Sequence, residues 1–170
     1  EHYCRSYAAL YGLEPTVLRF GIPYGPGARP AAVIPIFVDR AVRGEPLTLS
    51  GDGLQYRKFI YVEDLAEGIV AGLRPAAINQ TYNLDGQEKV SIKQIAETVQ
   101  KIVGDVSIEF GPARPGDFAG KDASSEKAFR ELEWRASTPF EAGVRRYVEW
   151  FKTQAKERAD SLARVDTSLL

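Results

Sequence analysis

The chain has 170 residues, 44% of them hydrophobic and 26% charged, and its 22 Lys and Arg nearly balance its 23 Asp and Glu. At this length one globular domain buries roughly 70% of the surface that its unfolded chain exposes, so it needs no metal or disulfide to form a core. The near-neutral charge argues against nucleic acid and anionic membranes as partners. Cys4 and His2 are the only residues of their kinds, which argues against a disulfide or a histidine-based metal cluster. No apolar run approaches the ~20 residues that span a bilayer, so we expect a cytoplasmic protein.

Residues 1–11 form the first predicted helix, because Tyr3, Tyr7 and Tyr11 share one side of it and Gly12 suits its C-terminal end. The helix has no N-cap residue in front of it. We therefore expect that it begins upstream of Glu1, in a longer protein.

A buried parallel strand is predicted over residues 16–20, which are mostly apolar and favour β-structure. Residues 21–27 are dense in glycine and proline, which predicts a loop. A helix follows over residues 32–42, with Pro35 tolerated in its first turn and Gly44 beyond its end.

Short strands and helices alternate through the middle of the chain. The predicted elements are strand 47–49, turn 51–53, strand 56–61, helix 62–73, strand 81–84, helix 92–103, strand 106–110 and polar loop 111–123. Ser91 and Gln94 form a capping box before helix 92–103. Glu63 and Asp64 lie in the first turn of helix 62–73, where carboxylates stabilise the helix end, so we assign them that role rather than acid-base catalysis.

Two helices close the domain. The first starts at Ser124 or Ser125, and Trp134 after it is predicted as a core aromatic. The second has Thr138 as its N-cap and Pro139 in its first turn. Residues 153–170 are charged and small, so this tail is predicted as solvated helix or disorder.

Six short motifs in this order resemble the extended short-chain dehydrogenase/reductases. They are Arg19-Phe20 with Tyr24-Gly25-Pro26-Gly27, Gly51-Asp52-Gly53, residues 59–66, Tyr82-Asn83-Leu84, Arg114-Pro115-Gly116-Asp117 and Leu132-Glu133-Trp134. More narrowly, the chain is similar to the C-terminal half of the NAD-dependent nucleotide-sugar epimerases and dehydratases, close to the UDP-glucose 4-epimerases. Each motif alone is weak, and their common order over nearly the whole chain makes the resemblance specific.

The resemblance implies an α/β fold: the last elements of a doubly wound Rossmann sheet and a small α/β substrate-binding lobe, without the N-terminal half of the Rossmann domain. Residues 1–152 would form this part, and residues 153–170 the tail. The family carries its glycine-rich pyrophosphate turn and its catalytic Tyr-x-x-x-Lys pair upstream of this region. No tyrosine here has a lysine four residues on, so we expect no catalytic residue in this chain and no activity from the chain alone.

The resemblance also implies a site for NAD and a nucleotide-diphosphate sugar. Phe20 and Pro23 would line the nicotinamide end of the cofactor, and Ile22 and Tyr24 the sugar pocket. An ordinary rigid loop is the alternative for this stretch. Ile22 stands where many relatives have an asparagine that contacts the sugar diphosphate, which leaves the identity of the sugar open.

The nucleotide part of that site is implied by five further residues. Arg57 and Arg114 match the family's phosphate-binding arginines, and a planar guanidinium meets phosphate oxygens with two hydrogen bonds. Asp117 would orient a guanidinium or accept a hydrogen bond from a ribose hydroxyl. Val33 and Leu49 match positions that line the base. Solvated charges for the arginines, and core packing for Val33 and Leu49, are the alternatives.

We therefore expect an NAD-using nucleotide-diphosphate-sugar epimerase similar to UDP-glucose 4-epimerase. A nucleotide-sugar 4,6-dehydratase, a UDP-glucuronate decarboxylase and a non-catalytic module that binds a nucleotide or a partner remain open as alternatives. Relatives are often dimers through a helix bundle, so the resemblance implies a homodimer with residues 1–11 at its interface. Lys58 replaces a more usual aspartate, and the sequence gives no reason for it.

Overall fold

The computed structural model describes residues 1–116, 119, 120 and 122–167, and their side chains as far as residue 157. The chain folds into two compact units. The first consists of Glu1–Pro23, Tyr56–Val90 and Ala119–Phe140, and the second of Tyr24–Gln55, Ser91–Phe118 and Glu141–Leu170.

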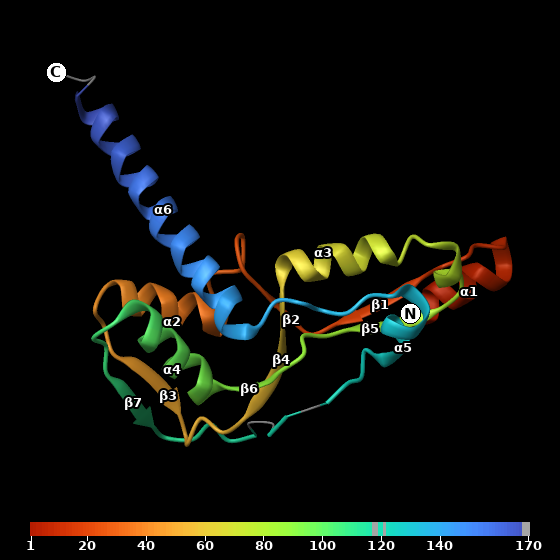
Figure 1. The fold of residues 1–170 in the computed structure, drawn as a ribbon, viewed down its shortest axis with the longest axis horizontal. Helices are drawn as coiled ribbons and strands as arrows, with labels where there is room; N and C mark the ends of the chain where they lie inside the picture. The colour runs from red at the N-terminus through yellow and green to blue at the C-terminus, as the bar shows by residue number, and fades with distance from the viewer. Residues whose placement is uncertain (117–118, 121, 168–170) are drawn as a thin grey trace. The chain divides into compact units, whose positions relative to one another are not determined.

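Two parallel strands of the first unit, β1 (Val17–Phe20) and β5 (Thr81–Leu84), lie side by side (Figure 1). Phe20 lies opposite Leu84. The predicted parallel strand is confirmed. Its predicted burial is wrong at the C-terminal end, because Arg19 and Phe20 are exposed. Within the part of the chain that the structure describes, β1 pairs with β5 alone. An apolar parallel strand is buried on both faces only where other elements cover it.

Helix α1 (His2–Tyr11) confirms the first predicted helix. Gly12 ends it with a φ of 66°, a left-handed conformation that glycine adopts without steric cost. None of its ten residues, all of them described, is buried. Its large side chains Tyr3, Leu10 and Tyr11 are exposed, so α1 gains little stability from packing within this chain.

Three short strands form a second sheet, almost entirely in the first unit, in the order β2 (Ile22–Tyr24), β4 (Tyr56–Tyr61), β6 (Lys89–Ser91). The predicted strand at residues 56–61 is confirmed. The predicted loop at residues 21–27 is wrong at residues 22–24, which form β2, and residues 25–27 are a bend and turn as expected. Strand β6 is not among the predicted elements. Pro23 is tolerated in β2 because an edge strand leaves one row of N–H groups unpaired.

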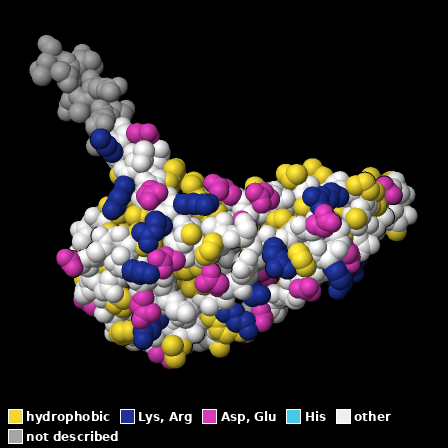
Figure 2. Space-filling view, viewed as in Figure 1, with side chains coloured by type: hydrophobic (Ala, Val, Ile, Leu, Met, Phe, Trp, Pro, Cys, Tyr) yellow, Lys and Arg dark blue, Asp and Glu magenta, His cyan; other side chains and the backbone are white. Residues whose placement is uncertain are grey.

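Helices α3 (Val62–Ala71) and α5 (Glu126–Leu132) and the short helix η1 (Pro75–Ala77) complete the first unit. Its core cluster consists of Ile60, Leu65, Ala71, Ala77, Tyr82, Leu84, Ala128, Leu132, Trp134 and Ala136. Two apolar residues of α3, Ile69 and Val70, are exposed, and Figure 2 shows yellow hydrophobic side chains at the surface over this helix.

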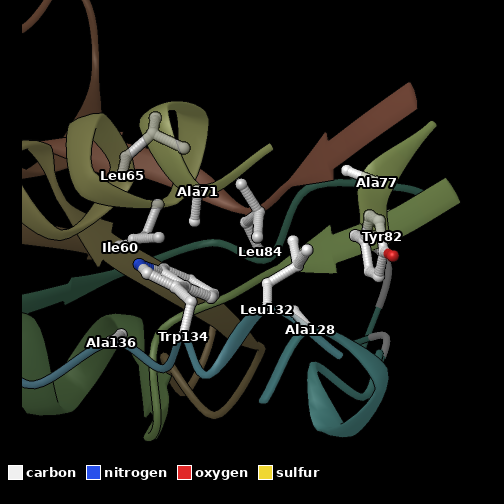
Figure 3. Close-up of a cluster of buried hydrophobic side chains, with 10 residues drawn as sticks. All are labelled: Ile60, Leu65, Ala71, Ala77, Tyr82, Leu84, Ala128, Leu132, Trp134 and Ala136. Atoms are coloured by element: carbon white, nitrogen blue, oxygen red, sulfur yellow. The ribbon is translucent and has the colours of Figure 1, made fainter. Parts of the chain in front are cut away.

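Trp134 lies in the middle of this core. Figure 3 shows its ring among Ile60, Leu84 and Leu132, which confirms the predicted core aromatic. Its Nε1–H donates to the Asp64 carbonyl oxygen at 3.1 Å. The indole is therefore buried without leaving its one donor unpaired.

The Asp64 carboxylate connects the start of α3 to the chain that follows α5. It is 3% exposed and accepts hydrogen bonds from the Ser137 hydroxyl at 3.1 Å and from the N–H and hydroxyl of Thr138 at 3.0 and 3.1 Å. Asp64 and Glu63 do lie in the first turn of α3, as predicted. The predicted N-cap position is wrong by one residue, because α6 begins at Phe140, directly after Pro139.

The second unit contains a parallel pair of strands, β3 (Leu47–Ser50) and β7 (Ile108–Gly111), packed with helices α2 (Val33–Val42) and α4 (Ile92–Val103). They confirm the predicted strands at residues 47–49 and 106–110 and the predicted helices at residues 32–42 and 92–103. The turn after β3 does not make a hairpin with β4, because β3 pairs with β7 and β4 pairs with β2 and β6.

The helix ends of the second unit follow local signals. In the capping box, the Ser91 N–H donates to Gln94 Oε1 at 2.8 Å and the Gln94 N–H donates to Ser91 Oγ at 3.1 Å, as predicted. Helix α6 (Phe140–Thr167) continues past residue 152, which is the helical alternative predicted for the tail. No helix in the described ranges is both long and apolar enough to cross a membrane.

Replacement of Asp64 by alanine is expected to lower the free energy of unfolding by about 3 kcal/mol, because three donors lose a buried charged acceptor. Urea unfolding followed by circular dichroism measures the change. Glu67→Ala lies in the same helix at an exposed position and should change stability by less than about 0.5 kcal/mol. Equal losses in the two variants would contradict the connecting role of Asp64.

Candidate functional site

The carboxyl ends of β1 and β5 lie at one edge of their sheet, because the strands are parallel. Gly21 follows β1, and its N–H donates to the Leu84 carbonyl oxygen at 3.3 Å. Asp85 follows β5 directly. In doubly wound folds, ligands bind beyond the carboxyl ends of the strands, so this edge is the candidate site of the first unit.

Two glycines allow the backbone to approach closely at this edge. A Cβ at Gly21 would lie 2.6 Å from both Asp85 Oδ1 and the Lys58 carbonyl oxygen. A Cβ at Gly86 would lie 1.8 Å from the Phe59 carbonyl oxygen. Any side chain at either position would push β4 away, so the glycines let β4 lie next to the ends of β1 and β5.

The residues predicted to line the cofactor and the sugar differ in exposure. Phe20 and Ile22 are 51% and 39% exposed, and Pro23 is exposed as well. Tyr24 is only 3% exposed and belongs to the second unit. A Cβ at Gly143 would lie 2.2 Å from the Tyr24 hydroxyl, so this ring packs against the backbone of α6 rather than projecting into solvent.

Arg57 lies in β4, in the same sheet as Ile22 and Pro23 of β2. It is partly buried, and its Nη1 donates to the Tyr56 carbonyl oxygen at 2.7 Å. The structure therefore brings the predicted phosphate ligand Arg57 onto the strand next to the predicted cofactor and sugar wall.

The other predicted nucleotide residues belong to the second unit. Arg114 is exposed and Val33 is half-buried, while Leu49 is 1% exposed, as core packing would require. Asp117 lies outside the described residues. Arg57 and Arg114 are thus in different units, and their joint contact with one diphosphate stays a prediction.

Lys58, which the sequence leaves without explanation, is the centre of a charge cluster. Its Nζ donates to the Ala123 carbonyl oxygen at 2.9 Å and lies 3.1 Å from Asp122 Oδ1. The second oxygen of Asp122 lies 2.7 Å from Lys89 Nζ. The hydrogen bonds from Lys89 and Lys58 lower the pKa of the Asp122 carboxyl, and Asp122 in turn raises the pKa of Lys89.

Asp85 is the second acidic residue near Lys58. It is 8% exposed, and burial raises the pKa of its carboxyl, while the Lys58 ammonium and the Gly21 N–H oppose that rise. Its backbone N–H donates to Ser125 Oγ at 2.9 Å. Asp85 is therefore fixed between the ends of β1 and β5 and the start of α5.

A cavity of about 590 Å³ opens beside these residues, within the first unit. Lys58, Asp85, Asp122, Ser124, Ser125 and Phe129 are among the residues that line it. None of them is among the site residues predicted from the sequence. Only Asp85 carries a sequence signal, because it is an acidic residue directly after a predicted parallel strand. Within the described ranges no group of His, Cys, Asp and Glu is arranged to hold a metal ion.

Curated relatives share this sequence over most of its length. UDP-glucuronate 4-epimerase of Thermodesulfobacterium geofontis is 32% identical over 148 residues, which cover 86% of this chain and 46% of that protein. The dTDP-glucose 4,6-dehydratase of Neisseria meningitidis is 27% identical over 164 residues, or 89% of this chain and 46% of the relative. The chain thus spans about half the length of the curated relatives it matches.

A solved structure of UDP-glucose 4-epimerase from Thermotoga maritima with UDP-glucose superposes with a TM-score of 0.85 at 28% identity, over 91% of this chain and 51% of that one. The structure of UDP-glucuronic acid 4-epimerase from Bacillus cereus, in complex with UDP-glucuronic acid and NAD, gives a TM-score of 0.82 at 28% identity, over 90% of this chain and 50% of that one. The sequence pattern of the NAD dependent epimerase/dehydratase family matches residues 1–85. The α/β fold with parallel strands and these matches agree with the predicted resemblance, and the chain belongs to the NAD dependent epimerase/dehydratase family.

Proposed function

We propose that the chain is the nucleotide-sugar-binding part of an NAD-using nucleotide-diphosphate-sugar epimerase similar to UDP-glucose 4-epimerase. The observation that carries the proposal is that β2 and β4 are neighbours in one sheet. This pairing sets the exposed Ile22 and Pro23 beside the strand that holds Arg57. Relatives solved with UDP-glucose, and with UDP-glucuronic acid and NAD, support the same substrate class.

Arg57 is the residue of the first unit that would bind the diphosphate. A nucleotide diphosphate carries about two negative charges, and a guanidinium meets two phosphate oxygens at once. Arg114, of the second unit, would supply a further charge, and Val33 would line the base. Asp117 would orient a guanidinium or accept a hydrogen bond from a ribose hydroxyl. Ile22 would border the sugar, whereas Leu49 and Tyr24 are 1% and 3% exposed, which fits core packing.

The residues present fit one end of NAD. Phe20, the last residue of β1, and Pro23, in β2, offer exposed apolar surface, which suits a flat nicotinamide ring at the carboxyl end of a strand. Gly25 and Gly27 flank a proline and lack the spacing of a turn that binds pyrophosphate. NAD, when bound, supplies a reversible hydride acceptor.

Epimerisation also needs a base for a sugar hydroxyl proton. Tyr3, Tyr7 and Tyr11 have no lysine four residues on, so none of them matches the family's Tyr-x-x-x-Lys pair. The role of this chain is therefore to bind and orient the nucleotide sugar. The proton is moved by residues of the whole protein that are not among these 170 residues.

A nucleotide-sugar 4,6-dehydratase is the second candidate, because a relative of that description aligns with 89% of the chain. The same diphosphate contacts would serve either reaction. A UDP-glucuronate decarboxylase and a non-catalytic binding module have no specific observation in their favour.

The homodimer also stays a prediction, and the exposed Tyr3, Leu10 and Tyr11 of α1 would form its contact.

Replacement of Arg57 by alanine is expected to weaken UDP binding roughly ten- to hundredfold, because it removes a charge-assisted contact of about 1.5–3 kcal/mol. Calorimetric titration of UDP into wild type and variant measures the effect. Arg43→Ala is the control, since Arg43 is exposed and paired with Asp39 at 2.9 Å. Equal dissociation constants for wild type and Arg57→Ala would remove Arg57 from the site.

The 170-residue chain alone is expected to give no epimerase, dehydratase or oxidoreductase turnover, because it has neither the Tyr-x-x-x-Lys pair nor the glycine-rich pyrophosphate turn. Purified chain incubated with NAD and a panel of UDP- and dTDP-sugars, followed by chromatography of the nucleotide sugars, tests this. A product whose amount scales with the chain and survives removal of host enzymes would contradict the assignment of the catalytic groups to other residues.

A further inference from the structure

The cavity beside Asp85 is not accounted for by the proposed diphosphate contacts. It measures about 590 Å³, which is within the range of small-molecule sites. All of its lining residues belong to the first unit, and Arg57 is not among them. Asp85 and Gly86, which follow the carboxyl end of β5, line it, and ligands of doubly wound folds bind beyond the carboxyl ends of strands.

The charges around this cavity disfavour an anionic ligand. Three carboxylates, those of Asp85, Asp122 and Glu126, line it together with two cations, Lys58 and Arg135. Lys58 is already held by Asp122 at 3.1 Å and by the Ala123 carbonyl oxygen at 2.9 Å. Asp122 also holds Lys89 at 2.7 Å, so a phosphate placed here would meet lysines that are already paired, together with two further carboxylates.

Two serine hydroxyls in the wall accept hydrogen bonds from the backbone. Ser125 Oγ accepts the Asp85 N–H at 2.9 Å, and Ser124 Oγ accepts the Glu126 N–H at 3.2 Å. Neither hydroxyl donates to an acceptor among the residues that the structure describes. A hydroxyl carries one proton besides its lone pairs, so each serine can give a hydrogen bond to a ligand while its oxygen remains anchored to the backbone.

Acceptors and an apolar surface accompany these donors. The Asp85 carboxylate is fixed by burial, and Phe129 lines the same cavity with 40% of its surface exposed. The Arg135 guanidinium lies 3.8 Å from the centre of the Phe129 ring, which holds both side chains at the cavity. The wall thus combines fixed acceptors, two hydroxyl donors and one aromatic side chain.

We propose that this cavity binds a neutral pyranose sugar, at a site separate from that of the nucleotide diphosphate. A sugar hydroxyl both donates and accepts, so neighbouring hydroxyls can donate to Asp85 and accept from Ser124 or Ser125. The apolar C–H groups of the ring pack against Phe129. The mixed wall suits such a ligand better than a phosphate or a purely apolar molecule.

One pyranose ring with three different charges tests the proposal. D-glucose, D-glucosamine and D-glucose 6-phosphate are titrated into the chain, and binding is followed by saturation-transfer NMR. Glucose and glucosamine are expected to bind, and glucose 6-phosphate to bind at least about tenfold more weakly. Absence of glucose binding, or preference for the phosphate, would overturn the proposal.

Variants locate the bound sugar. Phe129→Ala and Ser124→Ala should each weaken glucose binding several-fold, and circular dichroism checks that both remain folded. Phe110 is an exposed phenylalanine of the second unit, so Phe110→Ala is the matched control and should leave glucose affinity unchanged. If neither cavity variant alters glucose affinity, the sugar binds elsewhere and the proposal is wrong.

Two further measurements separate this site from the proposed function. Arg57→Ala should leave glucose binding unchanged even where it weakens UDP binding. UDP-glucose should not displace glucose, because the two sites are distinct. Displacement by UDP-glucose would assign the glucose to the nucleotide-sugar site and overturn a separate one, whereas loss of UDP binding alone would bear only on the proposed function.

Discussion

The parallel pairing of β1 with β5 determines where the candidate site forms. Because both strands run the same way, the residues that follow them, Gly21 and Asp85, leave the sheet at one edge. β4 lies close to that edge because residues 21 and 86 are glycines: a Cβ at position 86 would lie 1.8 Å from the Phe59 carbonyl oxygen, and one at position 21 would lie 2.6 Å from the Lys58 carbonyl oxygen. Segments far apart in the sequence therefore meet there, and the cavity lies beside them.

Local signals in the sequence predict the helices, and long-range pairing limits the prediction of the strands. The capping box of Ser91 and Gln94 and the C-terminal Gly12 depend on residues a few positions apart, and both are confirmed. β2 and β6 are three-residue strands without a periodicity of their own, and they are strands because they adjoin β4. The predicted burial of β1 is wrong for a related reason: an apolar run does not say which neighbours cover it.

The same distinction applies to the site. Arg57 follows from a family motif, and the structure adds only that its strand adjoins β2. The contact of Lys58 with Asp122 has no signal in the sequence, because the fold alone brings these two residues together. Asp64 shows both cases: its position in the first turn of α3 is visible in the sequence, whereas its three side-chain hydrogen bonds depend on packing.

Arg57 and Lys58 are adjacent cations on one strand, and their surroundings give them different roles. Successive side chains of a strand point to opposite faces, and Lys58 is the one that lies among carboxylates, with Asp122 at 3.1 Å and Asp85 nearby. A lysine held in this way attracts phosphate weakly, whereas a guanidinium has five N–H donors and meets phosphate through two of them. A diphosphate should therefore select Arg57. The opposite face of β4, where the charge of Lys58 is balanced, is left for a neutral ligand rich in hydroxyl groups.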